Sequence, residues 1–434
     1  MSMRSLYLLI GLVPSIASAA QSDGITQVFN DPTPVSQALS RGDVTALLQL
    51  QQDGSDPITR KMAKAAERRV LLDLPDTLQS SQDCLDAAEK TSHFGGMVVC
   101  GLLGASAQAA MGNLPAWAKL TLDSRDRIHA LSAQRGKVLG NVDVFSLVPD
   151  YRPLVNRRAP RVTQLAPGRI PLHKGSVTVA AANWHGGGQV TYPNMANVLI
   201  DGKSAEVLVD TGAFQTTVRS SAVSTPPFMD WLLLAGVFGT SGSRSALTQP
   251  QKLQMESLVI SEPFVATNDH LNVNLLGMDV LNRLGRIVLS AESIEIMGPG
   301  KSEHQCRSPL FAAPDLAGTA SMPRMFIEME GKRQEVMLDT GYNGELMEIL
   351  PAGSKLPNGE LEHSVTQGVQ GQQRRTSVSR SVDVLTTGAP EKLTMSTSIG
   401  EHQSGTYYLL GSGGLKNVSV YLDFTNRKAC LLPR

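Results

Sequence analysis

The triplet Asp-Thr-Gly occurs twice in this chain, beginning at Asp210 and at Asp339. Two carboxylates held close together can share one proton, activate a water molecule and protonate a carbonyl oxygen. One such triplet alone is typical of a strand that ends in a turn, because Thr and Gly are ordinary turn residues. The chemistry therefore depends on whether the two triplets are related copies.

The segments that precede the two triplets repeat one pattern. The first reads Gly-Lys-x-x-Glu-Val-x-x-Asp-Thr-Gly from Gly202, and the second has the same pattern from Gly331. Matched residues recur 129 positions later throughout (202 to 331, 206 to 335 and 210 to 339). So many matches without a gap indicate an internal duplication rather than two unrelated turns.

The duplication continues beyond the triplets. Leu-Leu-Gly follows the first triplet at Leu275–Gly277 and the second at Leu409–Gly411. A strand-like run comes after each, at Ile287–Leu289 and at Val420–Leu422. Each half therefore reads strand, hairpin, strand, Asp-Thr-Gly, long excursion, Leu-Leu-Gly and strand.

In this arrangement the chain resembles the retropepsin-like and pepsin-like aspartic peptidases. Each lobe of those enzymes carries two hydrophobic residues before Asp-Thr-Gly and, later, two hydrophobic residues before Gly. The resemblance covers roughly Leu172 to Arg434, and the first lobe is the closer retropepsin match. Retropepsin lobes usually come as two subunits, whereas here both lobes are fused in one chain.

The resemblance implies a role for each residue of the two triplets. Asp210 and Asp339 would be the catalytic pair, holding one water between them and hydrolysing peptide bonds without a metal or another cofactor. The two threonines would hydrogen-bond across a pseudo-twofold axis, and the two glycines would give backbone N–H groups room to meet the carboxylates. These supporting residues are Thr211, Gly212, Thr340 and Gly341.

Two Gly-rich segments lie between Asp-Thr-Gly and Leu-Leu-Gly, where the family places its flap over the substrate. Ordinary surface hairpins remain the alternative, because Gly marks any mobile loop. The candidate flap or substrate residues are Phe238, Gly239, Thr240, Val369 and Gln370.

Tyr342 departs from the family pattern. It follows Gly341, where the family has a small residue, and its counterpart in the first half is Ala213. A phenol at this position could tune the pKa values of the carboxyl pair, shape a substrate subsite or block the water.

The N-terminus predicts export. Arg4 precedes an apolar stretch from Leu6 to Ile16, and Ala17-Ser18-Ala19 supplies a small-residue cleavage pattern, so we expect a signal peptide over residues 1–19. An uncleaved anchor is the alternative, although the stretch is short for a span. We expect a periplasmic or secreted protein with no other transmembrane segment.

The charge balance and the cysteines restrict the function further. The 434 residues include 39 basic and 39 acidic side chains, a balance that favours neither nucleic acid nor an anionic membrane as partner. Four cysteines in an exported chain favour two disulfides, and four allow three pairings. Sequence positions favour Cys84–Cys100 and Cys306–Cys430, and no Cys-x-x-Cys supports a zinc site.

The chain before the duplication divides into a helical domain (20–140) and a linker (141–190). Apolar residues in the first part recur at helical spacing, and Thr33 before Pro34 predicts a capped helix start, as does Ser80 or Ser81. A tetratricopeptide-like array and an irregular bundle fit equally well; either could recruit a protein partner or cover the cleft. The linker is rich in Pro, Gly and Arg, and a propeptide is its alternative.

Short strands separated by Gly and Pro turns predict an all-β region for the rest. We expect a first lobe at 191–298, an interlobe linker at 299–322 and a second lobe at 323–434, with hairpin turns at Asp201-Gly202 and Glu330-Gly331. Strands are expected at 197–200, 206–209, 258–260, 287–289, 294–297, 326–329, 335–338, 382–385, 407–410 and 418–422.

The predicted fold class is multidomain, with an N-terminal all-α part followed by an all-β, two-lobed aspartic-peptidase fold. The favoured function is that of an exported aspartic endopeptidase acting on polypeptides. Two alternatives remain: a catalytically silent peptide-binding protein on the same fold, and an adaptor that acts through the helical domain.

Overall fold

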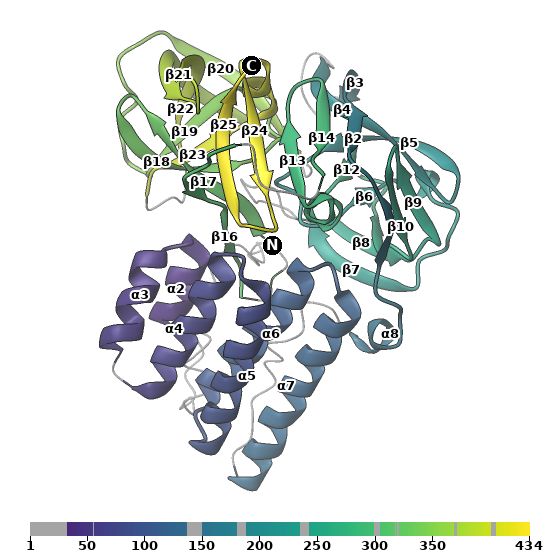
Figure 1. Cartoon of the computed structure of the whole chain (residues 1–434), viewed down its shortest axis with the longest axis vertical. Coiled ribbons are helices and arrows are strands. Elements are labelled where there is room, and N and C mark those ends of the chain that lie inside the picture. Colours follow the sequence, from purple (N-terminus) through teal and green to yellow (C-terminus); the bar gives the residue numbers. More distant parts are fainter. Residues whose placement is uncertain are drawn as a thin grey trace, which may run out of the picture. The chain divides into compact units, whose positions relative to one another are not determined.

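The protein was analysed as a computed structural model, which describes residues 33–54, 56–136, 150–179, 188–234, 243–298, 304–316, 318, 321–368, 371–400 and 405–434 (Figure 1). The predicted signal peptide and the five candidate flap residues lie outside these ranges. The chain forms two compact units. One comprises the helices up to residue 159 together with 312–321, and the other comprises 160–311 and 322–434.

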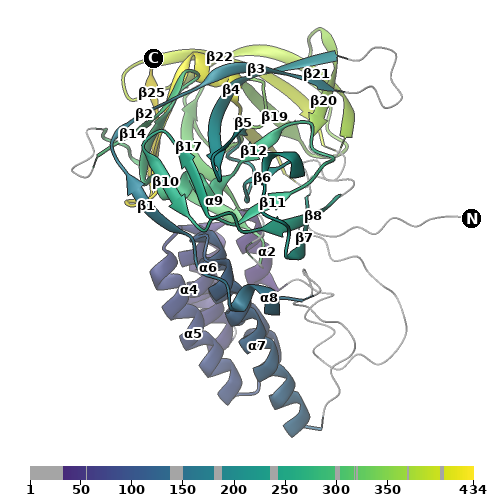
Figure 2. The same ribbon diagram turned by 90° about the vertical axis from the view of Figure 1, so that its right-hand side faces the viewer.

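The first unit is built from consecutive helices that pack side by side (Figures 1 and 2). They are α2 (Pro34–Arg41), α3 (Val44–Asp53), α4 (Pro57–Val70), α5 (Leu74–Lys90), α6 (Phe94–Ala110), α7 (Leu114–Gln134) and the short α8 (Arg152–Val155). Within the described ranges, none of them is both long and apolar enough to cross a membrane.

The starts of these helices follow from local sequence. Thr33 caps α2 as predicted, since its hydroxyl accepts the Ser36 N–H at 3.1 Å and Pro34 opens the helix. The predicted cap at Ser80 or Ser81 is wrong, because both residues lie inside α5 and are buried. The helix instead begins at Leu74, where Pro75 stands in the first turn.

Helix α6 forms the centre of this unit. Nearly all its residues are buried, and it packs against both α5 and α7. Gly101 brings α7 close, because a Cβ there would lie 2.5 Å from Ser124 Oγ. Cys84 of α5 is bonded to Cys100 of α6, which confirms the first predicted disulfide.

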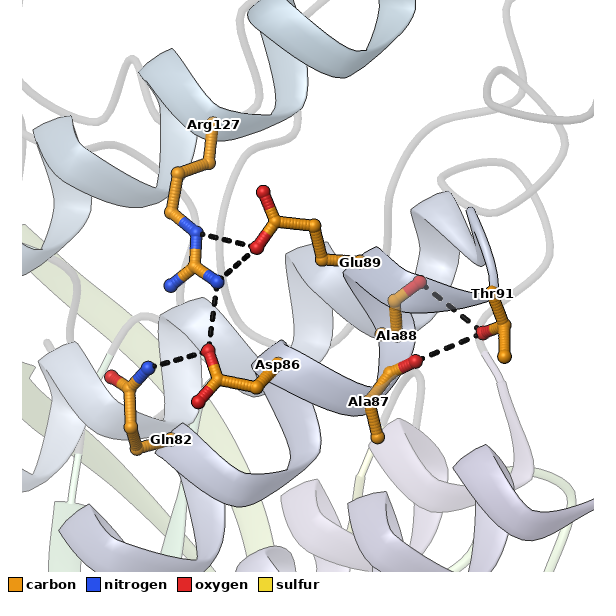
Figure 3. A network of polar contacts seen from close by, with 7 residues as sticks. All are labelled: Gln82, Asp86, Ala87, Ala88, Glu89, Thr91 and Arg127. Carbon is orange, nitrogen blue, oxygen red and sulfur yellow. Dashed lines mark hydrogen bonds and ion pairs between the residues drawn. The ribbon is translucent and has the colours of Figure 1, made fainter.

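Arg127 connects α7 to α5 on the surface of this unit (Figure 3). Its guanidinium donates to Asp86 Oδ1 at 2.8 Å and also to Glu89 Oε2. Gln82 bonds Asp86 in turn, at 2.8 Å, so the acceptor of the arginine is itself held in place. All of these groups are partly exposed, so each pair contributes on the order of 0–1 kcal/mol.

Part of the segment between the two lobes packs on the helices. Arg69 of α4 is fully buried and donates from Nε to Ser106 Oγ at 3.1 Å, while Asp315 of the connecting segment supplies opposing charge. Burial lowers the pKa of Arg69 to about 10, which leaves it protonated at neutral pH. Gly318 has φ +77°, and a Cβ there would lie 2.5 Å from Ser106. The segment therefore completes the core of the helical unit.

The second unit consists of β-sheets, in agreement with the predicted fold class. Its first sheet has the strand order β1-β10-β9-β4-β5-β12-β6-β11-β8-β7, with β3 beside β4. The strands are β1 (Arg161–Leu165), β3 (His173–Val179), β4 (Gly188–Ile200), β5 (Lys203–Val209), β6 (Thr217–Val218), β7 (Met229–Leu234), β8 (Ser243–Thr248), β9 (Lys252–Met255), β10 (Leu258–Ser261), β11 (Val265–Thr267) and β12 (Asn274–Leu276). Strands β1 and β3 occupy part of the predicted linker.

The second-lobe sheet has the order β16-β17-β18-β23-β19-β22-β21-β20. It contains β16 (Phe311–Pro314), β17 (Ser321–Met329), β18 (Lys332–Leu338), β19 (Leu346–Leu350), β20 (Leu361–Gly368), β21 (Gly371–Leu385), β22 (Pro390–Ile399) and β23 (Tyr407–Leu410). A third sheet takes strands from both lobes, in the order β15-β25-β24-β13-β14-β2. Its members are β2 (Gly168–Pro171), β13 (Arg286–Leu289), β14 (Ser293–Ile296), β15 (Ser308–Pro309), β24 (Val418–Asp423) and β25 (Lys428–Pro433).

The two lobes repeat the same hairpin in the same register. Met195 of β4 pairs with Leu208 of β5, and 129 positions later Arg324 of β17 pairs with Met337 of β18. The hairpin turns have positive φ at both central residues, 52° and 80° at Asp201-Gly202, and 50° and 72° at Glu330-Gly331. Those turns match the right-handed twist of the flanking strands and so fix the register that each aspartate inherits.

Cys306 is bonded to Cys430 of β25, which confirms the second predicted disulfide. This bond closes a loop of 124 residues, whereas Cys84–Cys100 closes one of 16. A longer closed loop restricts the unfolded chain more, and loops of these lengths correspond to about 5 and about 3 kcal/mol in the chain-entropy account. Together the two bonds are consistent with an exported protein.

We therefore expect Cys306→Ser/Cys430→Ser to lower the free energy of unfolding of the β-rich unit more than Cys84→Ser/Cys100→Ser lowers that of the helical unit. The expected losses are about 3–5 and about 2–3 kcal/mol. Denaturant unfolding followed by tryptophan fluorescence and circular dichroism measures both. Equal losses, or a larger loss for the short loop, would contradict the loop-length argument.

Candidate active site

Each aspartate follows a strand that has hydrogen-bonded neighbours on both sides in its sheet. Strand β5 runs parallel to β12, and β18 runs parallel to β23, so Leu-Leu-Gly lies beside Asp-Thr-Gly in each lobe. The Asp210 N–H donates to Leu276 O at 3.0 Å, and the Asp339 N–H donates to Leu410 O at 3.0 Å. The two halves of the sequence duplication therefore build two equivalent loops.

The threonines join the two loops, as the resemblance implied. Thr211 Oγ1 donates to Leu338 O at 2.7 Å and accepts the Thr340 N–H at 3.0 Å. Thr340 Oγ1 donates to Val209 O at 2.7 Å and accepts the Thr211 N–H at 3.0 Å. All four bonds cross between the lobes and are buried, so they fix the separation of the two aspartates.

The glycines allow the carboxylates to meet. A Cβ on Gly341 would lie 2.7 Å from both carboxylate oxygens of Asp210, and a Cβ on Gly212 would lie 2.6 Å from Asp339 Oδ1. Each carboxylate thus lies against the glycine of the opposite loop, at positions that tolerate no side chain. The same glycines donate, since Gly212 N–H reaches Asp210 Oδ1 at 2.8 Å and Gly341 N–H reaches Asp339 Oδ1 at 3.1 Å.

Burial raises the pKa values of the two carboxyl groups. Asp210 is 8% exposed and Asp339 is 7% exposed, and loss of solvent raises the pKa of each above the ordinary carboxyl range. The negative charge of Asp210 raises the pKa of Asp339 further. Backbone N–H groups of Gly212, Ala213 and Gly341 oppose the rise at Asp210. Backbone N–H groups of Gly341 and Tyr342 likewise oppose the rise at Asp339. The two carboxyl groups therefore titrate as a pair that holds one proton between them.

The Tyr342 ring packs against its own lobe. A Cβ on Gly344 would collide with the phenol oxygen and a Cβ on Gly411 with the ring, so the side chain lies over these two glycines. It also contacts the second-lobe apolar cluster of Met337, Met347, Ile349 and Leu409. Burial raises the pKa of Tyr342 to about 12, so the phenol stays neutral.

The first lobe carries a tyrosine near the pair from a different element. Tyr192 of β4 packs in a cluster with Met195, Leu208 and Leu275, against which Ala213 also packs. Burial, and then the charge of Asp210, raise the pKa of Tyr192. The position equivalent to Tyr342 in this lobe is Ala213, so an aromatic ring lies near the aspartate of each lobe but comes from β4 in the first lobe and from the loop after Gly341 in the second.

The sequence did not single out two further residues of this region. Asp279, in the short helix α9 (Met278–Leu281), accepts from Thr216 and Gln215 directly behind the first loop. Asn194 of β4 reaches the backbone of both loops. Asp279 follows Leu-Leu-Gly, which is a usable signal, whereas the only sequence mark of Asn194 is that the duplication replaces it by Pro323.

Loss of either threonine hydroxyl should weaken the junction, and the two losses should differ. Val209 O also accepts from Asn194, whereas among the described residues no second side chain donates to Leu338 O. We expect Thr211→Val to lower the free energy of unfolding by about 2–4 kcal/mol and Thr340→Val by about 1 kcal/mol less. Urea unfolding of the two variants measures this difference, and equal losses would contradict it.

Comparisons with known proteins gave one family match and a distant structural match. Residues 191–288, which contain the first Asp-Thr-Gly and the first Leu-Leu-Gly, match the family model of the retroviral aspartyl protease. The crystal structure of an aspartic proteinase from Irpex lacteus matches with 13% identity and a TM-score of 0.38, over 62% of this chain and 97% of that chain. No curated protein matches significantly. The family match confirms the resemblance to retropepsin-like aspartic peptidases.

Proposed function

We propose that this chain is an exported aspartic endopeptidase, which hydrolyses peptide bonds with a water held between Asp210 and Asp339. The observation that carries the proposal is the pair of buried carboxylates, each lying against the glycine of the opposite loop. Two like charges this close cannot both ionise readily, so the pair holds one proton over a range of pH. A pair with one proton can act as base and acid in the same step.

Within this proposal Asp210 is the base and Asp339 is the acid. Ionised Asp210 takes a proton from the water as its oxygen attacks the peptide carbonyl carbon, while Asp339 donates its proton to the carbonyl oxygen. Asp210 then returns the proton to the leaving nitrogen, the C–N bond breaks, and Asp339 recovers its proton from the tetrahedral intermediate. The chain itself supplies every acid and base in this sequence.

Two observations favour this function over the silent peptide-binding alternative. Tyr342 lies over Gly344 and Gly411 in its own lobe, which gives the ring a packing role. The Thr211 and Thr340 bonds are complete on both sides, so the second loop keeps the geometry of the first despite its different flanking sequence. The two disulfides support export.

The test is cleavage of a mixed peptide library by the full-length mature protein between pH 4 and 8, in water enriched in ¹⁸O. Attack by a water on the carbonyl carbon predicts products with one labelled carboxylate oxygen after a single turnover. A peptide with a hydroxyl-bearing tetrahedral carbon in place of the scissile carbonyl should inhibit. Folded protein that binds this inhibitor but cleaves no peptide would replace the proposal with the binding alternative.

A further inference from the structure

Asn194 of β4 has a side chain that contacts the backbone of both loops. Its side chain is fully buried. The Nδ2 group donates to Val209 O at 2.6 Å, in the first lobe, and to Thr340 O at 3.1 Å, in the second. Both partners are carbonyl oxygens, so only the NH₂ end of the amide can serve them.

One of the two carbonyls belongs to a peptide unit that contacts the carboxyl pair, and the other belongs to the peptide unit that leads into Asp210. The Val209 carbonyl shares its peptide with the Asp210 N–H. The Thr340 carbonyl shares its peptide with the Gly341 N–H, which donates to Asp339 at 3.1 Å and also favours the charged form of Asp210. A donor on the carbonyl oxygen polarises the peptide and strengthens the N–H on its other side. Asn194 therefore acts on a donor shared by both carboxylates.

The duplication makes this contact one-sided. The matched registers of the two hairpins place Pro323 where the first lobe has Asn194, and proline has no side-chain donor. Asn194 therefore distinguishes two loops whose threonine and glycine contacts are otherwise alike.

Keeping an amide at this position has a cost. Asn194 Oδ1 is buried and accepts no hydrogen bond from the part of the chain that the structure describes. A buried acceptor of this kind costs on the order of 1–3 kcal/mol, which an apolar side chain would avoid. The two donated bonds are the property that an apolar residue could not supply.

We propose that Asn194 is a positioning residue of the peptidase site, which bridges the two loops and holds the Gly341 N–H in place as a donor to the carboxyl pair. The inference rests on the proposed peptidase function. Other titratable or charged groups near the pair are Tyr192 on β4, Asp279 behind the first loop, Tyr342 on the second loop and, beside Tyr342, Glu345 together with Arg375 on β21. None of these is changed by substitution of Asn194, so the pair can be examined against a constant background.

The experiment compares Asn194→Ala and Asn194→Asp with Asn197→Asp, a matched control on the exposed face of the same strand. We measure kcat and KM for one cleaved peptide from pH 4 to 8. For Asn194→Ala we expect kcat to fall about 10- to 100-fold while KM stays within about twofold of the wild-type value. The substitution misaligns the carboxylates but leaves the contacts of the substrate in place. The acidic limb of the profile should move up by about half a pH unit, since a weaker Gly341 donor stabilises the carboxylate less.

Asn194→Asp supplies a second readout. Its side chain can donate one hydrogen bond while protonated and none once ionised, so its activity relative to the wild type should fall as pH rises on the alkaline side. A residue with a merely structural role would lower stability and leave both limbs of the profile unchanged. Values of kcat and of both limbs equal to those of Asn197→Asp, in folded protein, would overturn the inference while leaving the peptidase proposal intact.

An unfolding experiment tests the Asn194 bridge independently of turnover. It is needed if the wild type cleaves no peptide, because that result would remove the proposed function and with it the role of Asn194 in catalysis. The free energy of unfolding of Asn194→Asp should then still fall relative to Asn197→Asp between pH 4 and 8. The folded state raises the pKa of the introduced carboxyl, because two carbonyl oxygens face it, so stability is lost as pH rises. A pH-independent difference would overturn the bridge itself.

Discussion

Asp210→Asn and Asp339→Asn are each expected to reduce kcat/KM for peptide hydrolysis by about 10³-fold or more, because each removes either the base or the acid of one concerted step. The double variant should be no worse than either single one, since the two groups act as a unit. Measurement of kcat/KM over pH 4 to 8 tests this, with Asp383→Asn, an exposed carboxylate paired to Lys392, as control. Turnover by either single variant within tenfold of the wild type would contradict the mechanism.

The same variants should not lose stability at neutral pH. The pKa values of Asp210 and Asp339 are raised in the folded state, so their contribution to stability is complete below the unfolded pKa of about 4 and is lost as pH rises through the folded values. An amide does not ionise, so it avoids that loss. We expect the free energy of unfolding of both variants to be at least that of the wild type at pH 7. Their stability relative to the wild type should be lower at pH 4 than at pH 7.

The raised pKa values also set the pH range of activity. The pair holds a single proton only above the ordinary carboxyl range, so the optimum should lie nearer neutrality than the strongly acidic range, below about pH 3. Apparent pKa values from the profile belong to the pair rather than to one residue.

Asp279→Ala is the second substitution with a large expected effect, a loss of about 2–4 kcal/mol in the free energy of unfolding. Asp279 Oδ1 accepts the Thr216 N–H at 2.7 Å and its hydroxyl at 2.8 Å, and Oδ2 accepts from Gln215 at 3.1 Å. Alanine would remove this acceptor from both Thr216 donors beside the loop that carries Asp210, whereas Gln215 Nε2 would keep its bond to Phe264 O at 2.7 Å. Urea unfolding measures the loss, and a change below about 0.5 kcal/mol would contradict the role as a brace.

The pH dependence of this brace has a definite sign. Burial raises the pKa of Asp279 to about 6, against the opposing effects of Thr216 and Arg283. Relative to Asp279→Asn, the wild type should therefore lose stability as pH rises from about 4 to about 6 and change little above that range. A stability difference that stays constant from pH 4 to 7 would show that the carboxyl does not titrate there.

The second lobe fills the position equivalent to Asp279 with backbone instead of a carboxylate. Gly413 stands where the first lobe has Asp279, and a Cβ on it would lie 2.6 Å from Asn343 O. Close backbone packing thus replaces the buried carboxylate, and Ser412 N–H bonds Tyr342 O at 2.8 Å in place of the bond from Met278 to Ala213. The Ser-Gly-Gly sequence, which by itself could indicate a looser lobe, is buried throughout in η3 (Ser412–Lys416).

The helical part shows where sequence patterns failed. Apolar spacing predicted the helices, and Pro34 with Thr33 marked the first start, because caps and periodicity are local properties. Ser80 and Ser81 were misread as a cap because Ser is favoured at N-caps, whereas here packing buries both small side chains inside α5. No local pattern could reveal that Asp315 and Gly318 complete the core around Arg69, since that contact joins distant segments of the chain.

By itself, the sequence determined the duplication, both aspartates, the strands that carry them and their hairpin turns, and it favoured the cysteine pairing that the structure shows. These follow from residue spacing, from turns whose backbone favours Gly and from the few pairings that four cysteines allow. Only the tertiary structure decided that the two carboxyl groups are buried together, where the Tyr342 ring lies, and that Asn194 and Asp279 support the loops. The physical reason is that burial, orientation and hydrogen bonds between the lobes arise from packing of residues far apart in the chain, which no local spacing encodes.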